Sequence, residues 1–265
     1  MKKLYFLFFL LPLAIIPTAC EKVDSPSDNS RESLSNNAGS TNKVDEALIY
    51  YYPFDGNSQD QVSGQMLETN GATFGEDRFG NQNGALLMEE NVLHLDAGFS
   101  DTQGTVSFWI NVREFDYIVS LFKKASYLSS PDYYFLLHDD GSLSTAAAIK
   151  WGFVEAEGGG YNHVPLTTKP VIEKGKWYHI VLRWSDARKQ IEIFVNNKKI
   201  LSSKYTKTWR RIIYQQEPVA TMGWISNYQG NHEWENWYFR GRLDDLQRYK
   251  CWISDHKIKE LYSTK

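Results

Sequence analysis

Cysteine is nearly absent from this 265-residue chain, which has only Cys20 and Cys251. A disulfide framework is therefore excluded, and a folded domain must hold itself together by its hydrophobic core. The sequence also lacks an excess of charge of one sign, because 29 Lys and Arg against 32 Asp and Glu give a formal net charge of −3. Nucleic acid needs a basic surface, so this balance argues against such a partner.

Helical heptads, internal repeats and an alternation of strand and helix patterns are also missing. Aromatic residues are plentiful instead, with 9 Trp and 16 Tyr. Aromatic side chains favour strands and fill the cores of sandwiches, so their abundance is first a signal of fold. Apolar runs separated by turn residues then predict an all-β protein with two packed sheets.

The only long apolar run lies at the N-terminus, from Leu4 to Ile16, after Lys2 and Lys3. A membrane-spanning helix needs about 20 apolar residues, so this shorter run has the form of a signal peptide, residues 1–19. Small residues lead into Cys20, and this ending resembles a bacterial lipoprotein signal, which implies a lipid on Cys20. An ordinary cleaved signal with an incidental cysteine is the alternative.

Residues 20–46 are rich in Ser, Asn, Asp, Glu and Lys. Such a segment buries too little surface to offset its ordering entropy, so we expect a disordered tether. The charged residues after Cys20 resemble the surface-export tags of Bacteroidota lipoproteins, which implies an outer-membrane or cell-surface location with the lipid as the only membrane contact. A Cys20–Cys251 disulfide competes with lipid attachment.

The folded domain, residues 47–265, begins with a strand pattern at 47–52 and a turn at 53–57. In residues 105–112 the apolar side chains alternate with Ser107 and Trp109, and residues 176–184 repeat such a pattern around His179. Residues 155–161, with three glycines, are expected to be a loop, and Asn196 and Asn197 a tight turn. A glycine at 241, a strand through Asp244 and a short helix close the chain.

These motifs resemble the laminin-G-like domains of the concanavalin A-like lectin and glucanase superfamily. The resemblance rests on the opening turn around Asp55, residues 77–86, the Thr-x-Ser-x-Trp strand, the Trp-x-His strand and the closing Gly-x-Leu-Asp-Asp-Leu strand. It implies a two-sheet antiparallel jelly-roll sandwich with a short C-terminal helix. It also implies that His179 makes a structural hydrogen bond and that the first and last strands lie side by side.

Catalysis is not expected, although relatives on this fold include glycosidases. Retaining glycosidases need two carboxylates about 5–5.5 Å apart. In the glucanases of this fold, acidic residues occupy alternate positions of one strand. The nearest such pattern starts at Glu192, but its next two alternate positions are Phe194 and Asn196, which are not acidic. Glu233 and Glu235 lie in a loop-like context without a third acid, so we predict no catalytic residues.

A structural Ca²⁺ is the metal that the family resemblance implies, because oxygen ligands suit a hard cation. Asp55 in the opening turn and Asp244 in the closing strand match the two recurring acids of the family. The competing interpretation is that Asp55 caps its own turn and that Asp244 pairs with Arg242 or Arg78.

A polar segment rich in aromatic residues, 224–238, is the predicted carbohydrate-binding site. Exposed rings of Tyr228, Trp234 and Trp237 would stack on sugars, with Trp209 at the border. The expected partner is a polysaccharide or a glycoprotein glycan. The alternatives are core rings that plug the end of the sandwich, an adhesion domain that binds another protein, and an unusual glycoside hydrolase.

Overall fold

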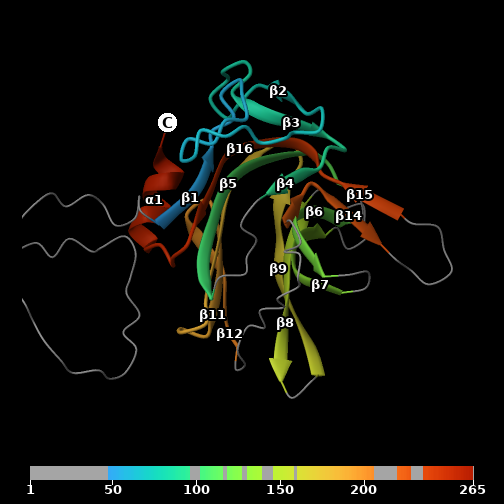
Figure 1. Ribbon diagram of the computed structural model, residues 1–265, viewed down its shortest axis with the longest axis vertical. Coiled ribbons are helices and arrows are strands. Elements are labelled where there is room, and N and C mark those ends of the chain that lie inside the picture. Colours follow the sequence, from blue (N-terminus) through green and yellow to red (C-terminus); the bar gives the residue numbers. More distant parts are fainter. Residues whose placement is uncertain are drawn as a thin grey trace, which may run out of the picture.

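The computed structural model describes residues 47–95, 102–115, 118–126, 130–138, 146–157, 160–205, 220–227 and 235–264. The predicted signal peptide and tether lie outside these ranges. The described residues form two antiparallel sheets, a two-stranded hairpin and one helix (Figure 1). Within these ranges, no helix has the length and apolarity that a membrane crossing requires.

The larger sheet has eight strands. Seven of them follow the order β12 (Lys198–Lys204), β11 (Gln190–Val195), β10 (Trp177–Ser185), β5 (Gln103–Glu114), β16 (Arg240–Tyr249), β3 (Ala85–Glu89) and β2 (Thr73–Gly75). The eighth, β1 (Leu48–Tyr52), pairs antiparallel with β16. The predicted contact between the first and last strands is therefore confirmed.

The smaller sheet has six strands. Their order is β4 (Leu93–Leu95), β13 (Ala220–Met222), β6 (Ile118–Ser126), β7 (Ser130–His138), β8 (Ala146–Glu157) and β9 (Gly160–Glu173). The hairpin of β14 (Trp224–Asn227) and β15 (Glu235–Tyr238) forms a separate two-stranded sheet. Residues 155–157 lie in β8 and residues 160 and 161 lie in β9, so the predicted loop is wrong at these positions. Pairing of the two strands overrides the local glycine signal.

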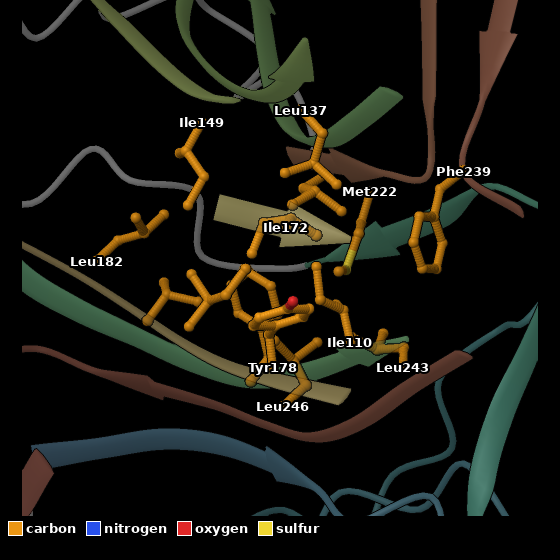
Figure 2. Close-up of a cluster of buried hydrophobic side chains, with 14 of the residues drawn as sticks. Ile110, Leu137, Ile149, Ile172, Tyr178, Leu182, Met222, Phe239, Leu243 and Leu246 are labelled. Atoms are coloured by element: carbon orange, nitrogen blue, oxygen red, sulfur yellow. The ribbon is translucent and has the colours of Figure 1, made fainter. Parts of the chain in front are cut away.

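The hydrophobic core lies between the two sheets. Figure 2 shows Ile110 and Leu182 of the larger sheet together with Ile149 and Ile172 of the smaller one. Strand alternation explains this placement, since successive side chains of a strand point to opposite faces. The two-sheet antiparallel sandwich predicted from these alternations is confirmed.

The outer face of the larger sheet is covered by the C-terminal segment. A second apolar cluster there joins Val181 and Phe194 of the sheet to Ile253 and Ile258. Ile258 belongs to the helix α1 (Asp255–Ser263), which the Ser254 side chain caps by accepting a hydrogen bond from the Lys257 amide. The short C-terminal helix is thus present, and it lies against this sheet (Figure 1).

Candidate functional site

Strand β16 changes its partner at Asp244 and Asp245. Residues 240–243 pair with β3, whereas residues 246–249 pair with β1. On its other edge β16 pairs with β5, and the register shifts between Asp244 and Gln247. Asp245 has a φ of 49°, a left-handed conformation that Asp tolerates better than most residues. This bulge brings two adjacent carboxylates to the outer face of the larger sheet.

Arg78 is the cation that faces both carboxylates. It forms ion pairs with Asp244 and, at 2.6 Å, with Asp245, and its side chain is only 7% exposed. The turn that carries it is fixed by the buried Asp77, which accepts hydrogen bonds from the amides of Phe79 and Asn81. A motif near the start of the domain is thereby locked to its closing strand.

Two aromatic side chains continue this cluster across the sheet. Trp109 of β5 lies opposite Asp244 on one side and opposite His179 of β10 on the other. The Arg78 guanidinium carbon lies 4.7 Å from the Trp109 ring centroid, and the His179 ring centroid lies 5.1 Å from it. His179 Nε2 is 2.8 Å from the Ser107 hydroxyl, which confirms the predicted structural hydrogen bond of this histidine.

Burial controls the ionisation of this cluster. Desolvation, with repulsion from Asp245, raises the pKa of Asp244 to about 8, although Arg78 opposes the shift. Desolvation, with the nearby Arg78 charge, lowers the pKa of His179 to about 3, so the imidazole is neutral near pH 7. Desolvation and the charges of Asp245 and Asp77 also raise the pKa of Asp55. The raised pKa favours the protonated form of Asp244 near neutral pH, and in this form its carboxyl shares Arg78 with Asp245.

The two predicted calcium ligands lie in the same region but do not share a ligand set. Asp244 pairs with Arg78, which is one of the two alternatives that the sequence left open. Asp55 is exposed and interacts electrostatically with Asp245 and Asp77. In the part of the chain that the structure describes, no three His, Cys, Asp or Glu residues are grouped so that they could hold a metal ion. Coordination of calcium by Asp55 and Asp244 stays a prediction.

Family comparison agrees with this architecture. Residues 79–259 match the family model of the concanavalin A-like lectin/glucanases superfamily. The chain belongs to this superfamily. The match includes Arg78's neighbour Phe79, the strands β5, β10 and β16, and most of α1. No curated protein sequence matches the chain closely enough to name a relative.

Solved structures show the same concanavalin A-like fold. Domain 4 of AbnA, an extracellular GH43 arabinanase from Geobacillus stearothermophilus studied in complex with arabinotriose, has a TM-score of 0.57 at 15% identity, covering 82% of this chain and 98% of that one. The binding domain of botulinum neurotoxin serotype C1 has a TM-score of 0.57 at 11% identity, and the match covers 83% of this chain and 52% of that one. At such identities the likeness establishes the fold alone.

The predicted carbohydrate-binding aromatics are placed only in part. Trp209, Tyr228 and Trp234 lie outside the described residues. Trp237 lies in β15, where its backbone pairs with Ile225 of β14, so this part of the polar aromatic segment is a strand. The local sequence around Trp237 is polar and without alternation, and only the pairing with β14 makes it a strand.

Two further contacts went unnoticed in the sequence. Arg78 was considered only as a partner of Asp244, yet it also reaches Asp245 and the Trp109 ring. Tyr262 of α1 stacks on Trp109 with 5.6 Å between ring centroids. The doubled acid after Leu243 was a usable signal for the first contact. The second had no local signal, because it joins residues 153 positions apart.

Proposed function

We propose that this protein is a non-catalytic glycan-binding module that a lipid on Cys20 tethers to a membrane. The observation that carries the proposal is the match to domain 4 of AbnA, which extends over 98% of that chain and was solved with arabinotriose. A structure of botulinum neurotoxin type C that concerns two ganglioside molecules, with a TM-score of 0.55, adds a second carbohydrate ligand on this fold. Membership of a lectin and glucanase superfamily agrees with both.

The segment between β14 and β15 is the proposed binding site. It carries Tyr228 and Trp234, and Trp237 follows in β15. Figure 1 shows the β14–β15 hairpin on the opposite side of the molecule from α1, at the edge of the sandwich. An aromatic ring presents a flat apolar face to the C–H groups of a sugar, while Asn and Gln side chains bond its hydroxyls. One neutral hydrogen bond contributes only about 0.5–1.5 kcal/mol, so a single site binds weakly and many tethered copies raise avidity.

The contacts of Glu192 support a binding role over hydrolysis. Glu192 is the acid at which the glucanase-like pattern would start, and its side chain is 2% exposed. It forms a buried ion pair with Arg183 and a second pair, at 2.8 Å, with Lys199. A carboxylate paired in this way is shielded from a sugar and serves to join two strands of the sheet.

A binding assay on the soluble domain, residues 47–265, tests the proposal. Immobilised polysaccharides and free arabinotriose are the probes, and a thermal melt of every variant separates lost binding from lost fold. We expect Trp234→Ala and Trp237→Ala to lose binding while their melting temperatures stay near that of the wild type. Met66→Ala is the matched control, because Met66 is an apolar side chain that is 62% exposed elsewhere.

Other outcomes of the same assay reject the proposal. If Trp234→Ala or Trp237→Ala lowers the free energy of unfolding by about 3–5 kcal/mol, the rings are core plugs and not a platform. Release of shorter sugars from a bound polysaccharide would indicate a glycoside hydrolase. Absence of glycan binding together with specific capture of a purified protein would indicate an adhesion domain.

A further inference from the structure

The last turn of α1 lays an aromatic ring on the outer face of the larger sheet. The Tyr262 ring lies nearly parallel to that of Trp109, with 15° between their planes and 5.6 Å between their centroids, and its centroid is 6.0 Å from that of His179. Trp109 and His179 are 9% and 1% exposed, whereas Tyr262 is 37% exposed. Tyr262 therefore covers an indole face that would otherwise be open to solvent.

The first half of α1, rather than its last turn, holds the helix to the sheet. Ile258 is the only buried residue of the helix, and Asp255 pairs with Arg183 at 2.5 Å. The last turn adds Leu261, which is partly buried against the second apolar cluster, the Tyr262 stack, and a hydrogen bond, 3.4 Å long, from Arg78 to the carbonyl of Thr264. Segments with few buried contacts open at a low free energy. The Tyr262 ring can therefore leave Trp109 without disturbing the core.

In the cluster that the Tyr262 ring contacts, three buried nitrogen atoms have no hydrogen-bond partner among the described residues. They are Nε1 of Trp109, Nδ1 of His179 and Nε of Arg78. All three side chains belong to one contact cluster, since Arg78 and His179 both lie against the Trp109 ring. A buried polar group without a partner costs about 1–3 kcal/mol, so three in one cluster indicate a place where a hydrogen-bonding molecule binds.

The charges of the cluster select the chemistry of that molecule. An anion would meet Asp244 and Asp245, which already neutralise Arg78. A cation would meet the N–H groups of Trp109 and Arg78, which only donate hydrogen bonds. A neutral ring with hydroxyl groups fits both, because each hydroxyl accepts as well as donates and the ring can stack on the indole.

We propose that the Trp109 face beneath Tyr262 is a second sugar-binding site, which the last turn of α1 closes in this structure. Tyr262 occupies the position of the sugar ring, and a neutral saccharide displaces it. Hydroxyl groups of the saccharide that extend past the edge of the indole then bond Trp109 Nε1, Arg78 Nε and His179 Nδ1. The ligand class is that of the proposed function, but the surface is distinct, because α1 and the β14–β15 hairpin lie on opposite sides of the molecule (Figure 1).

Nuclear magnetic resonance of the ¹⁵N-labelled soluble protein tests this site, with the indole N–H signal of Trp109 as the reporter. That signal is assigned as the one that disappears in Trp109→Phe. Arabinotriose and maltotriose are the neutral probes. In Tyr262→Ala we expect both the Trp109 signal to move and the affinity at this site to rise about tenfold over wild type, a gain of about 1.4 kcal/mol. Tyr262→Phe keeps the covering ring and should behave as the wild type.

The Trp237→Ala background separates this site from the proposed one. There the Trp109 shift of Tyr262→Ala should persist even though the hairpin site is lost. A Trp109 signal that sugar does not move in Tyr262→Ala overturns the second site, whether or not sugar binds elsewhere, and shows that water alone meets the three nitrogens. Truncation after Leu261 opens the site by another route, so a folding defect in one variant does not decide the result.

Discussion

At the residue scale, Asp244 combines burial with an acidic neighbour, and its raised pKa links stability to pH. The native state keeps the Asp244 proton up to about pH 8, whereas an unfolded carboxyl releases it near pH 4. Stability from this group is therefore present at low pH and falls as pH rises toward 8, by up to about 1.4 kcal/mol per pH unit. We expect Asp244→Asn to remove this slope in urea unfolding measured from pH 6.5 to pH 8.

The pH window matters because His179 acts in the opposite direction. Its folded pKa of about 3 lies below the ordinary value of 6.5, so its contribution is present above pH 6.5 and is lost as pH falls below it. Between about pH 4 and pH 6.5 the two groups oppose each other, and above 6.5 Asp244 acts alone. An equal slope in wild type and Asp244→Asn above pH 6.5 would contradict the assignment.

Calcium is a second residue-scale prediction, and Arg78 sets a condition for it. Asp244 must release Arg78 before it can bind a metal ion together with Asp55. If calcium binds only the native state, a free calcium concentration one hundred times the dissociation constant raises the free energy of unfolding by about 2.7 kcal/mol. We expect a chelator to lower the melting temperature of the wild type and to leave Asp55→Asn unchanged. If the chelator leaves the melting temperature of the wild type unchanged, Arg78 is the only cation that faces these carboxyl groups.

Gly241 supports a third prediction at this scale. A Cβ atom at this position would lie 2.2 Å from the carbonyl oxygen of Asn111 on the neighbouring strand, so only glycine fits this close approach of the two backbones. Gly241→Ala forces β16 away from β5, and such overpacking costs about 1–3 kcal/mol. Gly75→Ala is the control, because its Cβ would have no contact shorter than 3.6 Å. Chemical denaturation should show a loss only for Gly241→Ala.

At the element scale, the attachment of α1 and β11 depends on Arg183. Its guanidinium pairs with the buried Glu192 and with Asp255, and it lies over the rings of Phe194 and Trp252. Removing one partner of a buried pair leaves an uncompensated charge, so Arg183→Met should cost about 3–5 kcal/mol of stability.

Asp255 provides the contrast for this prediction. Its side chain is 66% exposed, and an exposed ion pair contributes only about 0–1 kcal/mol. Asp255→Asn should therefore change the midpoint of denaturant unfolding far less than Arg183→Met. If both variants lose the same stability, the buried pair with Glu192 is not what fastens these elements.

The sequence predicted those elements whose pattern is local. The alternation in residues 105–112 placed Phe108 in the core and Trp109 on the outer face, and the turn at Asn196 and Asn197 has positive φ at both positions, as a tight hairpin requires. The bulge at Asp245 was not predictable, because it depends on β16 changing partner between β3 and β1.

The candidate sites were less predictable than the fold for the same reason. Arg78 contacts Asp244 across 166 positions of sequence. The residues next to them in the sequence do not indicate whether Asp244 pairs with Arg78, pairs with Arg242 or binds calcium. Tyr262 reads in the sequence as one exposed position of a short helix. Only the packing of α1 on the sheet brings its ring to Trp109.

At the scale of the whole molecule, the two cysteines decide how the domain is attached to the cell. Cys251 is buried and disulfide-bonded. Cys20 is the only other cysteine in the sequence. A sulfur that carries lipid cannot also form a disulfide, so lipid attachment and a bridge exclude each other.

We expect the exported protein to carry lipid on Cys20, a state that excludes a Cys20–Cys251 bridge. The mass of the N-terminal peptide of the exported protein should then include the lipid. Because one acyl chain binds a membrane only marginally, stable anchoring needs more than one, and Cys20→Ser should move the protein to the soluble fraction. Cys251→Ser is the matched control and should stay with the membrane. If the N-terminal peptide carries no lipid and Cys20→Ser stays membrane-bound, the anchor is not a lipid on Cys20.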